Sequence, residues 1–96
     1  MALLSDADID RGLAGLDGWR REAGEQGSIA REFEFPDFAA AMAFVQRVGA
    51  AAEEANHHPD ILLHGWNKVR LTYSTHSAGG LTEADFAQAA RVSDLA

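Results

Sequence analysis

Three of the four histidines are the residues of this chain best suited to acid–base chemistry. His57 and His58 are adjacent and directly precede Pro59, while His76 lies further along the chain. Imidazole titrates near neutral pH, so histidine both donates and accepts protons under physiological conditions. Pro59 disfavours helical geometry at His58, and successive extended residues point in different directions. We therefore predict that the two adjacent imidazoles reach different atoms of one ligand.

A carboxylate precedes this histidine pair. Glu53 stands four residues before His57, close to the end of a predicted helix, where the macrodipole disfavours negative charge. One interpretation is that Glu53 orients His57 or favours its protonated form. The other is that Glu53 is an ordinary solvated glutamate beside Glu54. Residue spacing leaves both interpretations open.

Metal binding is the main competing role for the histidines. A zinc pair on a helix needs histidines four residues apart, whereas adjacent histidines do not share a helix face. The chain has no cysteine. A site would therefore need His57 or His58 together with His76 and a carboxylate. On this ligand spacing we expect no metal site.

These residues must be positioned by the elements around them. Apolar side chains alternate in the segment that precedes His76, where Val69, Leu71 and Tyr73 face one way. Helical spacing is strongest before His57, with a stripe through Phe38 and Met42. In chain order the expected elements are a helix from Ser5 to Asp17-Gly18, a strand Trp19–Glu22, a loop Gly24–Gly27, a strand Ser28–Phe35, a helix over 37–55, strands Ile61–Trp66 and Lys68–Thr75, and a helix from Thr82.

The order α-β-β-α-β-β-α predicts an α+β fold. Short connections between consecutive strands favour antiparallel pairing, and the apolar faces need cover. We therefore expect a four-stranded antiparallel sheet with the helices packed on one face. The 96 residues are predicted to form a single domain, 1–96.

Composition limits the kinds of partner. The net charge is -7 and the eight basic residues are scattered, which argues against direct nucleic-acid binding. Apolar stretches are shorter than the ~20 residues that cross a bilayer, so we expect no membrane association. The start Met1-Ala2-Leu3-Leu4 lacks a basic region, and the absence of cysteine suits a reducing compartment. We expect a cytoplasmic protein.

The residues singled out above belong to a longer pattern that resembles the signature of the pterin-4a-carbinolamine dehydratases. The pattern reads Glu53-x3-His57-His58-Pro59, six residues, Trp66, nine residues, His76, eight residues, Asp85. Flanking stretches resemble the same family, namely Gly18-Trp19, Phe35-x-Asp37-Phe38, Asn67-Lys68-Val69 and Ser74-Thr75-His76. The resemblance extends from about Trp19 to the last helix.

This resemblance implies a fold and an activity. The fold it implies is the four-stranded sheet expected above, in dimers joined edge to edge and often in tetramers made through helices. The activity is that of a hydro-lyase, the dehydration of a 4a-hydroxytetrahydropterin to quinonoid dihydropterin without metal or organic cofactor, in recycling of the pterin used by aromatic amino-acid hydroxylases. By resemblance His57 and His76 are the acid–base pair, His58 binds the pterin ring, and Glu53 bonds to the pterin or to a catalytic residue.

Two further members of the pattern have alternative roles. Trp66 is either a wall of the substrate pocket or packing at a strand end. Asp85 stands three residues after Thr82, which places it at the N3 position of a capping box. We expect this structural role to dominate, although the helix start could hold Asp85 near His76 and the substrate. His64 falls outside the pattern and is expected on the surface.

The sequence leaves two other functions open. A non-catalytic dimerisation or assembly module could share the same fold, as some relatives of these dehydratases do. An enzyme acting on another hydroxylated pterin is the second alternative. The intact histidines favour catalysis, because a binding module has no need of them.

Overall fold

A four-stranded antiparallel sheet forms the centre of the molecule. The computed structural model describes residues 2–24 and 27–96, so the predicted loop Gly24–Gly27 lies partly outside the described residues. The elements are α1 (Asp6–Ala14), β1 (Arg20–Glu22), β2 (Ser28–Glu34), α2 (Phe38–Ala55), β3 (Asp60–His64), β4 (Lys68–Tyr73), a 3-10 turn η1 (His76–Ala78) and α3 (Glu83–Leu95). The strand order is β1-β2-β4-β3. The predicted α+β class and element order are confirmed.

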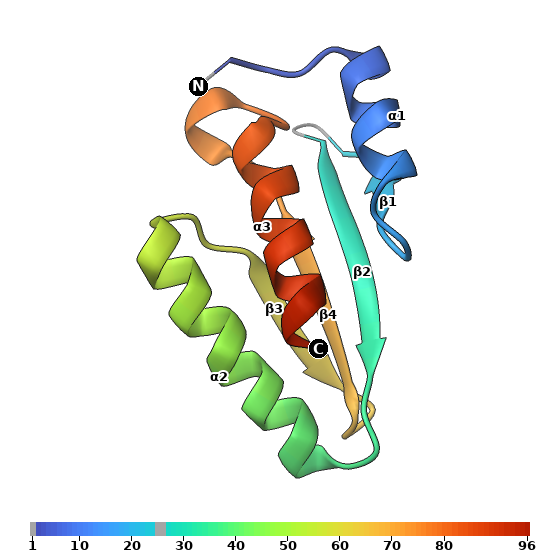
Figure 1. The fold of residues 1–96 in the computed structure, drawn as a ribbon, viewed down its shortest axis with the longest axis vertical. Coiled ribbons are helices and arrows are strands. Elements are labelled where there is room, and N and C mark those ends of the chain that lie inside the picture. The colour runs from blue at the N-terminus through green and yellow to red at the C-terminus, as the bar shows by residue number, and fades with distance from the viewer. Residues whose placement is uncertain (1, 25–26) are drawn as a thin grey trace.

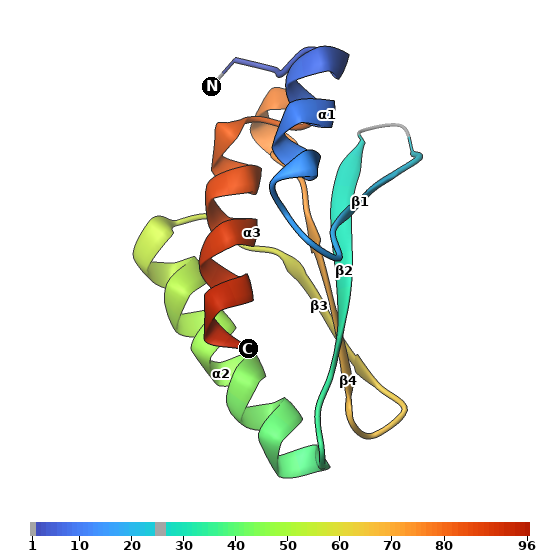
Figure 2. The same cartoon turned by 45° about the vertical axis from the view of Figure 1, so that its right-hand side comes forward.

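The helices leave one face of the sheet open. Figures 1 and 2 show α2 and α3 side by side over the same face, with α1 at one end of the molecule. On this covered face the alternation predicted for β4 is confirmed, because Val69, Leu71 and Tyr73 are fully buried. They meet Phe44 of α2 and Val92 of α3 in one core. The other side chains of β4 project from the open face.

Local capping signals place the helix starts and the end of α2 as predicted, whereas α1 ends at Ala14, before the predicted turn at Asp17-Gly18, because the chain leaves helical geometry at Gly15. The Ser5 hydroxyl accepts a hydrogen bond from the Asp8 backbone N–H, and Asp37 accepts one from Ala40. Asn56 ends α2 in the left-handed conformation, with φ 50°. The next backbone N–H, that of His57, donates to the Ala52 carbonyl at 3.0 Å. This C-terminal motif sets the direction in which the histidine pair leaves the helix.

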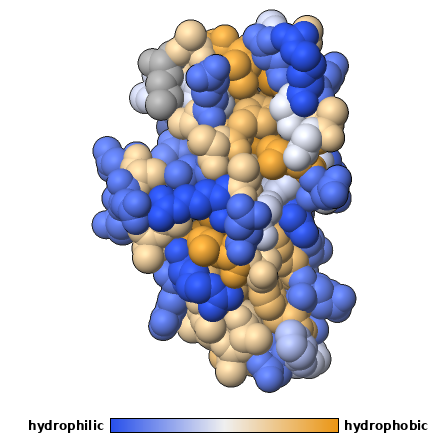
Figure 3. All heavy atoms as spheres, in the orientation of Figure 1, coloured by the Kyte–Doolittle hydropathy of each residue, from blue (hydrophilic) through white to orange (hydrophobic). Residues whose placement is uncertain are grey.

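The buried face of α2 differs from the predicted stripe. Phe38 and Met42 are 52% and 40% exposed, whereas Ala41, Phe44 and Val48 are buried. The buried stripe of α2 is therefore centred on Ala41, Phe44 and Val48 and not on Phe38 and Met42. Hydrophobic side chains also break the hydrophilic surface at several places in the view of Figure 3. No helix in the described ranges is both long and apolar enough to span a membrane.

Strand β3 is shorter than predicted. It ends at His64, and the residues before Lys68 form a turn in which Gly65 and Trp66 have φ values of 56° and 60°. Trp66 is therefore a turn residue and is 61% exposed. The strand prediction failed there because Gly65 turns the chain before the aromatic side chain can join the sheet. Strand β4 likewise ends at Tyr73 instead of Thr75.

Candidate active site

The two adjacent histidines occupy different environments. The His57 ring lies parallel to the Tyr73 ring, with an interplanar angle of 10° and 6.0 Å between centroids, and its side chain is 14% exposed. The His58 side chain is 55% exposed and pairs with the Glu53 carboxylate. The two imidazoles thus point in different directions, while their contact with one ligand stays a prediction. His57 points into the protein and His58 points outwards.

Glu53 does not pair with His57, as one of the two interpretations required. Its carboxylate contacts His58, five residues later, and not His57. The left-handed turn at Asn56 reverses the chain, and His57 is turned towards Tyr73. The interpretation that Glu53 directly orients His57 is therefore wrong. Its partner is nevertheless a member of the same histidine pair.

The buried carboxylate of Asp85 contacts the His57 ring. Asp85 is fully buried, and its Oδ1 lies 2.7 Å from Nε2 of His57. Its Oδ2 accepts hydrogen bonds from the Thr75 hydroxyl at 2.8 Å and from the Thr82 backbone N–H at 3.0 Å. The predicted capping box is confirmed. A carboxylate without exposed surface does not support direct contact with a substrate, and its histidine partner is His57 instead of His76.

The same carboxylate is connected to the segment that carries His76. Thr75 directly precedes His76, and its backbone N–H donates to the Gly80 carbonyl at 2.9 Å. This bridge closes the loop in which His76 begins the 3-10 turn. The Thr75 hydroxyl lies 2.8 Å from the Thr82 hydroxyl as well as from Asp85. One buried hydrogen-bond cluster thus supports both His57 and the base of the His76 loop.

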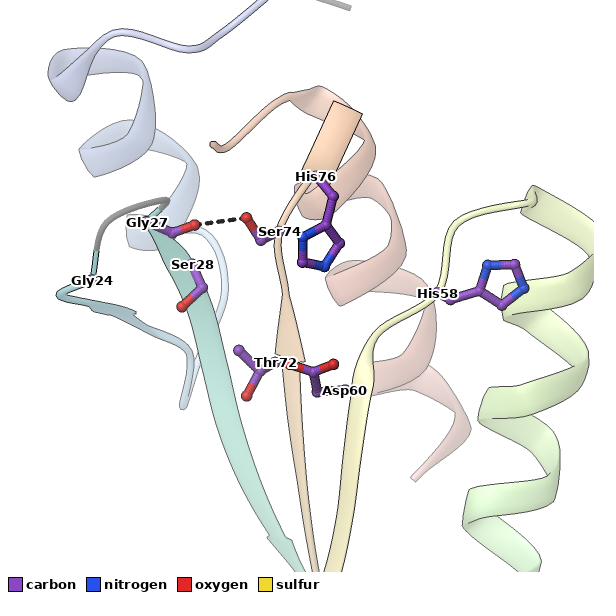
Figure 4. Close-up of a pocket in the computed structure, with 8 residues that line it drawn as sticks. All are labelled: Gly24, Gly27, Ser28, His58, Asp60, Thr72, Ser74 and His76. Atoms are coloured by element: carbon purple, nitrogen blue, oxygen red, sulfur yellow. Dashed lines mark hydrogen bonds between the residues drawn. The ribbon is translucent and has the colours of Figure 1, made fainter. Parts of the chain in front are cut away.

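An open polar cleft lies beside this cluster. Its volume is about 400 Å³, which is within the usual range for small-molecule sites. Both His58 and His76 line it, together with hydroxyl groups and a carboxylate; the lining residues are Gly24, Gly27, Ser28, His58, Asp60, Thr72, Ser74 and His76. Figure 4 shows the His76 ring above the end of β4 and the His58 ring on the side of α2. The Ser74 hydroxyl donates to the Gly27 carbonyl at 2.8 Å.

The predicted site residues are only partly brought together. His58 and His76 line the cleft, His57 is held behind them by Asp85, and Glu53 joins through His58. Trp66 lies at the opposite end of the β3–β4 hairpin. It neither lines the cleft nor packs at a strand end, since most of its side chain is exposed.

The remaining histidine is on the surface, as expected. His64 pairs with Glu32 on the open face of the sheet, away from the cleft. Within residues 2–24 and 27–96, no three histidine or carboxylate side chains converge in an arrangement that could hold a metal ion.

Several supporting residues were not identified from the sequence. Alternation predicted only that Tyr73 is buried, and nothing local indicated that it lies under His57. Burial, together with the negative charge of Asp85, raises the pKa of the Tyr73 hydroxyl. Thr75 and Asp60 were also missed, because their roles depend on the pairing of distant segments.

The cleft is equipped for proton transfer at a small polar ligand. It presents imidazole groups, which both donate and accept protons near neutrality, beside hydroxyl groups that can orient a ligand. The carboxylate at Nε2 of His57 fixes the orientation of that ring, as a carboxylate does in other histidine pairs. In the described residues there is no cysteine that could act as a nucleophile.

Comparison with known proteins points to one family. A sequence model for the family described as Pterin 4 alpha carbinolamine dehydratase matches residues 2–95. A protein of Roseiflexus castenholzii, provisionally named pterin-4-alpha-carbinolamine dehydratase, is 48% identical over 98% of this chain and 97% of its own length. A protein of the same provisional name from Acidobacterium capsulatum is 50% identical over 99% of both chains.

Two solved structures have the same fold. A protein of Brucella melitensis described as a transcriptional coactivator/pterin dehydratase superposes with a TM-score of 0.92 and 34% identity over 99% of both chains. A pterin dehydratase-like protein described as a RuBisCO assembly factor in the alpha-carboxysome gives a TM-score of 0.69 and 33% identity. That match covers 81% of this chain and 88% of the other.

Proposed function

Because this chain belongs to the pterin-4a-carbinolamine dehydratase family, we propose that it is a hydro-lyase that converts 4a-hydroxytetrahydropterin to quinonoid dihydropterin. The observation that carries the proposal is the polar cleft with His58 and His76 in its wall and the Asp85–His57 pair behind it. The whole chain would act as one domain. Its place would be cytoplasmic recycling of a tetrahydrobiopterin-type cofactor.

The reaction needs one proton donor and one proton acceptor. Water leaves when the N5 lone pair of the substrate expels the C4a hydroxyl, which must be protonated as it departs. The N5 proton must then be removed, so the sum is loss of one water molecule. Histidine suits both steps near neutral pH, and the N5 lone pair supplies the driving electrons without a metal or an organic cofactor.

We assign the proton transfers to His57 and His76, and ring binding to His58 paired with Glu53. Asp85 accepts a hydrogen bond from Nε2–H of His57, which leaves Nδ1 of the neutral imidazole as an acceptor. This tautomer suits His57 to the role of base. His76 at the cleft then protonates the leaving hydroxyl.

A non-catalytic assembly role is the rival function. It is favoured by the structural similarity to the protein described as a RuBisCO assembly factor. The bond between Asp85 and His57 favours catalysis, because the capping of α3 does not require this second partner and a binding surface has no need of an oriented imidazole.

Turnover of the 4a-hydroxy compound by the purified protein tests the proposal. Its decay to quinonoid dihydropterin is followed by ultraviolet absorbance, with heat-denatured protein as the control. We expect the native protein to accelerate this decay over the denatured control by at least ~10²-fold, the lower end of what a positioned acid or base supplies. The same decay rate with native and denatured protein would favour the assembly role instead.

A further inference from the structure

The open face of the sheet carries several carboxylates, and one of them differs from its neighbours. Glu22 pairs with Arg70, and Glu32 pairs with His64. Asp60, at the start of β3, lines the cleft. Among the residues that the structure describes, no side chain forms a hydrogen bond or ion pair with its carboxylate. The one arginine on the neighbouring part of β4, Arg70, is already engaged by Glu22.

Strand register places Asp60 opposite a hydroxyl group. Asp60 and Thr72 are paired across the β3–β4 ladder, and both line the cleft. Figure 4 shows their side chains next to each other, with the His76 ring beyond the end of β4. Thr72 and Ser74 are two residues apart on one face, which is about 7 Å along the strand. The cleft therefore has a carboxylate beside Thr72 and an imidazole beyond Ser74, and these two strand positions are about as far apart as the length of a fused two-ring system.

A pterin presents a complementary pattern of donors. Its pyrimidine ring carries an exocyclic 2-amino group beside N3–H, so two N–H donors point in the same direction. A carboxylate accepts two parallel N–H bonds with matching geometry, and such charge-assisted bonds are roughly twice as strong as neutral ones. The reacting C4a and N5 atoms lie on the other side of the ring system from the 2-amino group. With the amino edge at Asp60, these atoms are directed towards His76.

We propose that Asp60 is the residue that recognises the 2-amino-pyrimidine edge of the pterin, with Thr72 beside it. This inference rests on the proposed function, and it makes Asp60 a determinant of specificity and not a proton donor or acceptor. Asp60 selects pterins over ring systems that lack the amino group. It also sets the orientation in which N5 meets the histidines.

Binding of a dihydropterin to Asp60→Asn tests this role. The amide keeps the shape but offers one acceptor oxygen without charge. A calorimetric titration of the folded protein compares two dissociation constants. One is for 7,8-dihydropterin, and the other is for the same ring with a 2-oxo group in place of the 2-amino group. Asp10→Asn is the matched control, because Asp10 is an exposed aspartate on α1, outside the cleft.

We expect Asp60→Asn to weaken dihydropterin binding by about 10- to 100-fold, the range for a lost hydrogen bond to a charged group. The 2-oxo compound should bind the wild-type protein weakly, and Asp60→Asn should not lower its affinity further. KM for the 4a-hydroxy substrate should rise by the same factor with kcat changed less than about threefold. Unchanged dihydropterin affinity in Asp60→Asn overturns the role of Asp60 while leaving the proposed function intact. Failure of the wild-type protein to bind any dihydropterin overturns both.

Discussion

Replacing Asp85 with asparagine should damage both stability and catalysis. Asp85 is fully buried and serves three hydrogen-bond partners, His57, Thr75 and Thr82. Asparagine keeps the shape but provides only one acceptor oxygen. If each bond loses about 1 kcal/mol of charge assistance, the free energy of unfolding falls by about 2–3 kcal/mol. For a chain of this size that lowers Tm by about 10–20 °C.

The same substitution reverses the hydrogen bond to His57. When the asparagine oxygen faces Thr75 and Thr82, its amide N–H₂ faces Nε2 of His57. Nε2 must then act as the acceptor, so the proton moves to Nδ1 and the ring loses the acceptor proposed for catalysis. Turnover should fall at least about 100-fold, the lower end of the effect of a lost positioned base, while dihydropterin binding changes little.

Glu83→Gln provides the matched control. Glu83 is also in the first turn of α3, but it is exposed. Losing its charge removes only the interaction with the helix dipole, about 0.3–1 kcal/mol. Thermal melting and turnover are measured on the same preparation of each variant. If Asp85→Asn melts no lower than Glu83→Gln and retains its turnover, the Asp85 carboxylate neither stabilises the fold nor positions His57.

Metal independence, self-association and the buried Tyr73 hydroxyl can each be tested. Dialysis against a strong chelator should leave turnover unchanged, because histidine supplies the acid and the base; loss of activity that zinc restores would make the histidines ligands. Light scattering at micromolar concentration should give at least a dimer of the 10.3 kDa chain, since sheet edges and Phe38 and Met42 are exposed; a monomer alone would contradict this. Tyr73→Phe should keep or raise Tm, because the buried hydroxyl has no hydrogen-bond partner in the described part of the chain. Because the pKa of Tyr73 is higher in the folded protein than in the unfolded chain, its contribution to stability is fully present below pH 10 and is lost as the pH rises through the raised value. Phenylalanine does not titrate. Above pH 10 the free energy of unfolding, measured with denaturant, should therefore fall less steeply for Tyr73→Phe than for wild type.

The fold could be predicted from local signals because most of its elements are marked by short-range chemistry. The alternation of Val69, Leu71 and Tyr73 identified a half-buried strand, and Asn56 marked the end of α2. Thr82 and Asp85 are three residues apart, so their capping box was also readable from the sequence. These signals need no knowledge of which segments meet in space.

The site was less predictable because its contacts join distant segments. The bond between His57 and Asp85 spans 28 residues, and the pairing of Asp60 with Thr72 depends on hairpin register. Residue spacing suggested Glu53 as the partner of His57. The left-handed turn at Asn56 instead places His58 next to the Glu53 carboxylate. The family resemblance identified the histidines but did not predict the contact between Asp85 and His57.

In the proposed mechanism, histidine side chains and not the fold alone carry out the dehydration. The most direct measurement is single-turnover decay of 4a-hydroxytetrahydropterin with His57→Ala and His76→Ala. His64→Ala is the control, because His64 pairs with Glu32 outside the cleft. We predict that His57→Ala and His76→Ala each slow dehydration by ~10²–10⁴-fold, while His64→Ala stays near wild type. Wild-type rates in both His57→Ala and His76→Ala, with folding intact, would contradict this mechanism.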